Sequence, residues 1–219
     1  MILQLERLQT LLERIYGVSS DLRVDDFLIS DPQQVRRLHR GGRNTKEKLL
    51  ISEDGNGLDV ALFVHEKILN ALAEDDPLSR LHDGNLNAFW VALEGVSHFL
   101  YLVFNASSGR SVRLLEMELQ AEVDKFVATL FLLRRQAVSG SHRRLHHYLF
   151  ERTQFDSALS PEDLTRYRDA NRYAGKYCLR LSRSYLNRRR RAGLVDELRR
   201  FYRMPQSAKL RHIDHGIDR

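Results

Sequence analysis

The residues of this sequence best suited to chemistry are Glu94, His98, Glu118 and Glu122, which lie in two strongly apolar segments. Glu94 and His98 are four residues apart, as are Glu118 and Glu122, so each pair shares one face of a helix. Carboxylate and imidazole groups that face one another across two helices hold divalent metal ions in helical bundles. These four residues are therefore candidates for a metal-binding or catalytic cluster.

A second interpretation makes the same cluster purely structural. Bundle metal sites usually place Glu and His three residues apart, whereas the spacing here is four. Lys125 follows Glu122 by three residues and would repel a metal ion in an interior of low dielectric constant. The sequence therefore favours a buried network in which Glu94, His98, Glu118, Glu122 and Lys125 neutralise one another, with metal binding as the alternative.

The elements that must position this cluster are two long helices, predicted over residues 87–105 and 111–135. Nearly every residue of the first is apolar, which leaves it little surface for water. The segment between them, 105–110, is rich in Asn, Ser and Gly and is typical of a turn. A helical hairpin is therefore expected at the centre of the fold.

The turn sets which residues of the two helices lie at the same level. If the chain folds back near Ser108, the residue numbers of facing positions sum to about 217, which places Glu118 beside His98 and Glu122 beside Glu94. The two polar rows meet only if they face each other. A further polar row on the second helix is expected to face outward, and it comprises Arg113, Glu116, Gln120 and Asp124.

The rest of the chain predicts a mainly α protein with a small β element near its N-terminus. Residues 2–16 have the apolar spacing of an amphipathic helix that ends at Gly17. Residues 48–52 and 58–64 alternate as strands around a Gly-rich turn, and 23–30 is a candidate third strand. The predicted fold class is a helical bundle around the central hairpin, with a β-hairpin or three-stranded sheet.

The predicted organisation has three parts that form one compact unit. Residues 1–84 make an N-terminal α+β portion packed on the core, and residues 85–203 make the helical bundle. Residues 204–219 contain few apolar side chains and are expected to be a flexible tail.

Charge is distributed unevenly along the chain. Residues 1–133 carry 14 Lys/Arg and 20 Asp/Glu, a net charge of −6. Residues 134–219 carry 21 Lys/Arg and 9 Asp/Glu, a net charge of +12, and the whole chain has a net charge of +6. Such a basic half is typical of contact with anions, or is neutralised within the protein. The candidate anion-binding residues are Arg172, Lys176, Arg180, Arg183, Arg188, Arg189, Arg190 and Arg191.

Composition narrows the class of protein without fixing a function. A single cysteine, Cys178, excludes an intramolecular disulfide and favours a reducing compartment. A signal peptide and an uncharged membrane span are not predicted, so a cytoplasmic location is expected. Motifs of serine hydrolases, P-loop NTPases and two-cysteine oxidoreductases are not found.

The prediction for function is a non-enzymatic helical binding protein. Its basic C-terminal face would contact an anionic partner: nucleic acid, a phosphate-rich ligand, or an acidic protein surface, including that of a second copy in a homo-oligomer. The alternative is a metal-binding helical-bundle protein or enzyme that uses the Glu/His cluster and a divalent metal.

Overall fold

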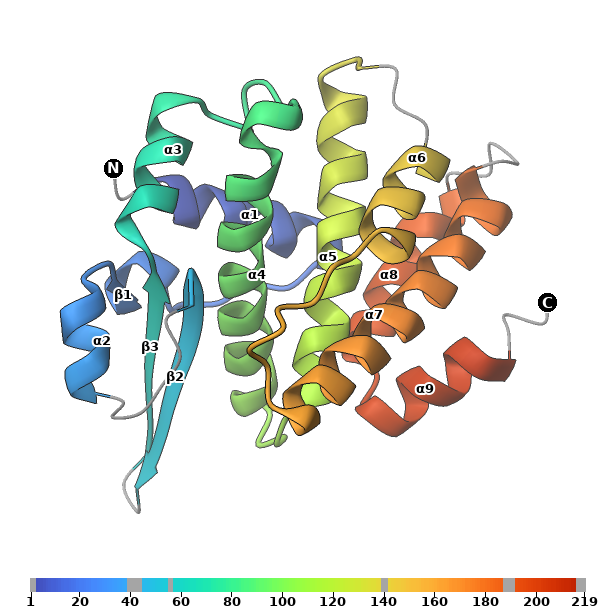
Figure 1. Ribbon diagram of the computed structural model, residues 1–219. Helices are drawn as coiled ribbons and strands as arrows, with labels where there is room; N and C mark the ends of the chain where they lie inside the picture. Colours follow the sequence, from blue (N-terminus) through green and yellow to red (C-terminus); the bar gives the residue numbers. More distant parts are fainter. Residues whose placement is uncertain (1–2, 39–44, 55–56, 139–141, 187–191, 216–219) are drawn as a thin grey trace.

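The protein is built mainly from helices, with a small sheet at one side (Figure 1). The computed structural model describes residues 3–38, 45–54, 57–138, 142–186 and 192–215. The predicted fold class, a helical bundle around a central helical hairpin with a small sheet, is confirmed.

The central hairpin consists of α4 (Asp83–Ala106) and α5 (Leu114–Arg135). α4 begins with a capping box in which the His82 side chain accepts from the backbone and Asn85 bonds back to the His82 amide. In the turn, Gly109 has a φ of +64°, a conformation that glycine adopts without a steric penalty. α4 is long and apolar enough to cross a membrane, but 67% of its most apolar window is buried inside the protein.

The sheet lies against α4 and has the strand order β1-β3-β2. β2 (Glu47–Asp54) and β3 (Gly57–Val64) form the predicted antiparallel hairpin. The third strand, β1 (Leu28–Ile29), pairs parallel to β3 and is shorter than predicted, because Val24–Phe27 forms a 3-10 turn instead. α2 (Pro32–Leu38) follows β1.

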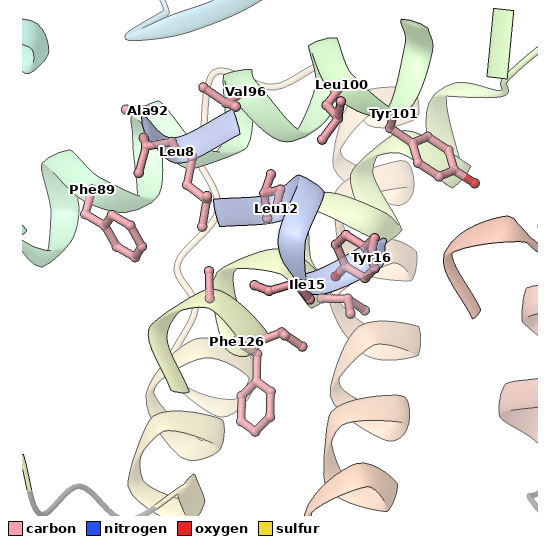
Figure 2. Packing of buried hydrophobic residues seen from close by; sticks show 14 of the residues in the cluster. Leu8, Leu12, Ile15, Tyr16, Phe89, Ala92, Val96, Leu100, Tyr101 and Phe126 are labelled. Atoms are coloured by element: carbon pink, nitrogen blue, oxygen red, sulfur yellow. The ribbon is translucent and has the colours of Figure 1, made fainter. Parts of the chain in front are cut away.

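Two N-terminal helices close one side of the core. α1 (Leu3–Tyr16) buries its apolar stripe against α4 and α5, and Figure 2 shows Leu8, Leu12 and Ile15 among apolar side chains of these two helices. Gly17, with a φ of +58°, ends the helix. α3 (Glu66–Glu74) packs against α4.

The C-terminal half wraps around α5. α6 (His142–His146) continues as a π-helical turn over His147–Glu151, and α7 (Pro161–Leu181) packs along α5 before a second π-helical turn over Ser182–Leu186. Ser160 caps α7 by accepting from the Asp163 amide. Cys178 is fully buried, as expected of a structural thiol. α8 (Ala192–Arg203) and α9 (Gln206–His215) complete the chain.

The expected flexible tail is wrong for residues 206–215, because they form α9. Ile213 and Lys209 are both buried, and the Lys209 ammonium lies over the rings of Tyr101 and Phe201, 4.4 and 4.9 Å from their centroids. The expectation of a flexible tail was based on the small number of apolar residues, but the aliphatic part of a lysine such as Lys209 can also be buried in the core. Residues 216–219 lie outside the described part.

The C-terminal end of α1 contacts α8. Tyr16 at the end of α1 stacks on Tyr202 of α8, with ring centroids 4.1 Å apart. The Arg203 guanidinium donates to the carbonyls of Tyr16 and Gly17 at 3.0 and 2.8 Å. These contacts satisfy carbonyl groups that the last turn of α1 leaves without helical partners.

The polar row on α5 that was expected to face outward is instead buried at three of its four positions. Glu116, Gln120 and Asp124 are each at most 3% exposed. Asp124 accepts hydrogen bonds from Tyr16, Ser97 and Gln120. α5 therefore packs against α4 and α7, and its expected outer row is covered by α1 at Asp124 and by α9 at Gln120.

Lys209 should make stability depend on pH. It donates to Gln120, and its burial lowers its pKa to about 7 although Glu116 and Asp124 oppose that shift. Between pH 7 and its usual pKa near 10.5 the unfolded chain binds more protons, so the free energy of unfolding should rise with pH, by at most about 1.4 kcal/mol per pH unit. Denaturant titrations of wild type and Lys209→Met from pH 7 to about 9 should show this rise only in wild type. Equal slopes in both proteins would contradict it.

Candidate metal centre

The polar stripes of α4 and α5 face each other in the bundle. His98 Nε2 and Glu118 Oε2 are 3.4 Å apart, an ion-pair distance without the geometry of a hydrogen bond. Lys125 Nζ lies 2.7 Å from Glu94 Oε2 and 2.9 Å from Glu122 Oε1. The structure therefore brings all five polar residues of the predicted cluster into one region.

Within this region, Glu122 has a different position from the other three candidates. It pairs with Lys125 and accepts from the Asn171 amide of α7 at 3.3 Å. By contrast, ligand atoms of Glu94, His98 and Glu118 lie within 4.8 Å of one another, close enough to hold one metal ion. We call these three residues the Glu/His trio.

A fourth carboxylate comes from the sheet. Glu47, at the start of β2, has an enclosed Oε2 atom that accepts no hydrogen bond, although the residue as a whole is only half-buried. Gly95 allows this approach, since a Cβ there would lie 2.9 Å from Leu62 Cδ1 and 3.1 Å from Glu47 Oε2. Glu47 was not predicted as a site residue from the sequence. The one signal for it was its position in β2, two and four residues before Leu49 and Ile51, so that all three side chains lie on the same face of the strand.

α7 supplies the remaining wall. Arg166 Nε lies 3.8 Å from Glu118 Oε1 and is buried without a hydrogen-bond acceptor, while its terminal nitrogen donates to Asp163 at 2.7 Å. Tyr167 lines the same space. The sequence reasoning missed Arg166 as well, because it lies on α7 among other basic residues and only the packing of α7 on α5 brings it here.

The trio lines a cavity of about 680 Å³ between β2, α4, α5 and α7. His98 is only 6% exposed, and its Nε2 atom has no hydrogen-bond partner. Its charged partner is the Glu118 carboxylate, whose Oε2 atom is 3.4 Å away. The cavity thus presents an imidazole nitrogen and carboxylate oxygens that protein groups leave incompletely satisfied.

The pKa values of two groups in the cavity, Glu47 and His98, are raised. Burial and, to a smaller extent, the neighbouring Glu94 raise the pKa of Glu47 to about 8. Burial alone would lower the pKa of His98, but Glu118, Glu47 and Glu94 outweigh it and raise that pKa to about 9. Burial is thus the main cause of the Glu47 shift, whereas neighbouring carboxylates cause the His98 shift.

Lys125 pairs with two carboxylates of the cluster, Glu94 and Glu122. Burial lowers its pKa, but Glu122 and Glu94 more than compensate and raise it above the usual value. With the pKa of Glu47 at about 8 and that of His98 at about 9, Glu47 is protonated and His98 is a cation at neutral pH. Three carboxylates, Glu94, Glu118 and Glu122, then face Lys125, Arg166 and His98, so a metal ion that binds His98 must displace its proton.

The candidate anion-binding residues of α7 are largely engaged within the protein. Arg172 pairs with Asp169, Lys176 pairs with Asp214, and Arg180 donates to the carbonyls of His212 and Ile213 at the end of α9. A cation at a helix C-terminus is favoured by the helix dipole. Arg183 remains exposed and Arg188–Arg191 lie outside the described residues, so anion binding by this half stays a prediction.

Comparison with known proteins assigns no class beyond this architecture. No family model, curated protein or solved structure matches the chain. The helical bundle and its cavity are therefore the basis for functional inference.

Proposed function

We propose that the protein binds one divalent metal ion in the bundle, with Glu94, His98 and Glu118 as its ligands. The observation that carries this proposal is the trio itself: three ligand atoms within 4.8 Å of one another, lining a cavity, with a buried His98 Nε2 that has no hydrogen-bond partner. A bound cation would take the place of the His98 proton beside the carboxylates of Glu94 and Glu118.

The donor set defines the class of metal. One imidazole nitrogen and two carboxylate oxygens suit borderline divalent ions such as Zn²⁺, Mn²⁺ or Fe²⁺, and disfavour soft ions that select thiolates. Three protein ligands leave coordination positions open, as in sites where water or a substrate completes the shell. Glu47 lies beside the trio and is available to accept a hydrogen bond from such a water.

Lys125 then acts as a positioning residue. A carboxylate has two oxygens, so the Lys125 ammonium can hold Glu94 through one of them while the other binds the metal.

The proposal is tested by metal titration of protein purified without a metal-affinity tag. We expect calorimetry with Zn²⁺ and Mn²⁺ to give one site in wild type, and the affinity in His98→Gln to fall at least about 100-fold because a ligand is lost. His147→Gln is the matched control: His147 is an exposed histidine paired with Glu151, so its loss should leave the site intact.

Two outcomes would overturn the assignment. Wild type that binds no metal would leave the trio as a structural network. Equal affinity in wild type and His98→Gln, with the fold of each checked by circular dichroism, would place the metal elsewhere.

A further inference from the structure

The cavity around the Glu/His trio has an apolar rim. Ile51 of β2 and Leu114 of α5 both line it, and they are 44% and 56% exposed, among the most exposed large apolar side chains in the described residues. Leu49, Met117 and Leu159 also line it. Apolar side chains exposed at the rim of a cavity can contact the apolar part of a ligand.

The rim and the polar floor belong to the same two elements. On β2, Glu47 and Ile51 are four residues apart on one face, which separates them by about 13 Å along the strand. On α5, Glu118 and Leu114 are one helical turn apart, or about 6 Å along the axis. Both elements therefore pass from a carboxylate inside the cavity to an apolar side chain at its edge.

Basic groups in the cavity wall indicate what the polar end of a ligand would be. Arg166 Nε is buried and lacks an acceptor, so it is a donor that a ligand oxygen would satisfy. Lys46 and Lys48 also line the cavity. A carboxylate is the group that both a metal ion and a guanidinium recognise well.

We infer that the cavity binds an amphiphilic monocarboxylate. Its carboxylate lies at the metal and Arg166, and its aliphatic or aromatic part lies on Ile51, Leu114 and their apolar neighbours. The volume, about 680 Å³, is within the range of small-molecule sites, about 300–1,000 Å³. This inference rests on the proposed metal site, because the metal supplies the positive charge that the carboxylates of the floor require before an anion can bind.

The test uses decanoate as the probe and metal-loaded protein in calorimetry. We expect decanoate to bind at least about tenfold more tightly than acetate, because its chain contacts the rim. Leu114→Gln and Ile51→Gln should each weaken decanoate binding several-fold, while zinc affinity stays as in wild type. Leu22→Gln is the matched control, since Leu22 is 45% exposed but does not line this cavity.

The outcomes separate the two proposals. If zinc binds in the trio but decanoate binds no better than acetate, or if Leu114→Gln and Leu22→Gln behave alike, the ligand assignment is wrong and the metal site stands. The assignment of a carboxylate as the polar end of the ligand would be wrong if decylamine bound more tightly than decanoate. It would also be wrong if metal did not strengthen the binding of decanoate. Failure of zinc to bind at all would overturn both proposals.

Discussion

Replacing Lys125 with Met is expected to lower the free energy of unfolding by about 3–5 kcal/mol, the usual loss when one partner of a buried ion pair is removed. Lys125 is enclosed between Glu94 and Glu122 at 2.7 and 2.9 Å. Without the ammonium, two carboxylates lie close together with no cation between them. Urea unfolding, followed by the fluorescence of Trp90, the single tryptophan, measures the change.

The matched control for this variant is Lys176→Met. Lys176 also pairs with a carboxylate, Asp214 at 3.0 Å, but its side chain is 49% exposed. An exposed pair contributes about 0–1 kcal/mol, so the control should lose little. Similar losses in the two variants would mean that water screens the ion pairs of Lys125 as strongly as it screens the exposed pair of Lys176.

Lys125→Met also bears on the proposed metal site. With the ammonium gone, repulsion between Lys125 and the metal disappears, and a metal ion neutralises Glu94 in its place. Saturating Zn²⁺ should therefore stabilise Lys125→Met more than it stabilises wild type, by an amount that grows with the metal concentration over its Kd. Equal stabilisation of both proteins would contradict coordination by Glu94.

Removal of the Asp124 carboxylate is the second substitution with a large expected effect. Asp124→Ala leaves Tyr16, Ser97 and Gln120 without their acceptor in a buried region. Each unsatisfied buried group costs about 1–3 kcal/mol, so a total loss of about 3 kcal/mol or more is expected in chemical denaturation. Amide exchange should rise most in α1, because Tyr16 is its last residue.

Asp169→Ala provides the comparison for Asp124. Asp169 is a carboxylate on α7 that is paired with Arg172 at the surface, so its loss should cost less than about 1 kcal/mol. A loss of that size for Asp124→Ala would show that the three donors find other acceptors or water.

The facing of α4 and α5 was predictable from the sequence because local rules govern it. The helical period places Glu94 and His98 on one face, and a short turn fixes which residues of the next helix lie opposite. The observed 3.4 Å separation of His98 and Glu118 agrees with that register. Two neighbouring helices and a turn thus determine half of the candidate site.

The other half depends on packing between elements distant in the sequence. Glu47 reaches the trio because the sheet packs on α4 at Gly95, and Arg166 reaches it because α7 packs on α5. Neither placement follows from periodicity or turn composition. The error about the polar row on α5 has the same origin: Gln120 and Asp124 were assigned to solvent, but helices from both ends of the chain cover them.

The contacts of Arg203 with the end of α1 have a consequence for the order of events during synthesis. The C-terminal end of α1 finds these partners only after residue 203 has been translated and released. α4 and α5 precede α8 in the chain, so their hairpin can form while the Tyr16 ring still lacks its stacking partner Tyr202. The docking of α8 on α1 is therefore a late step in the folding of this chain.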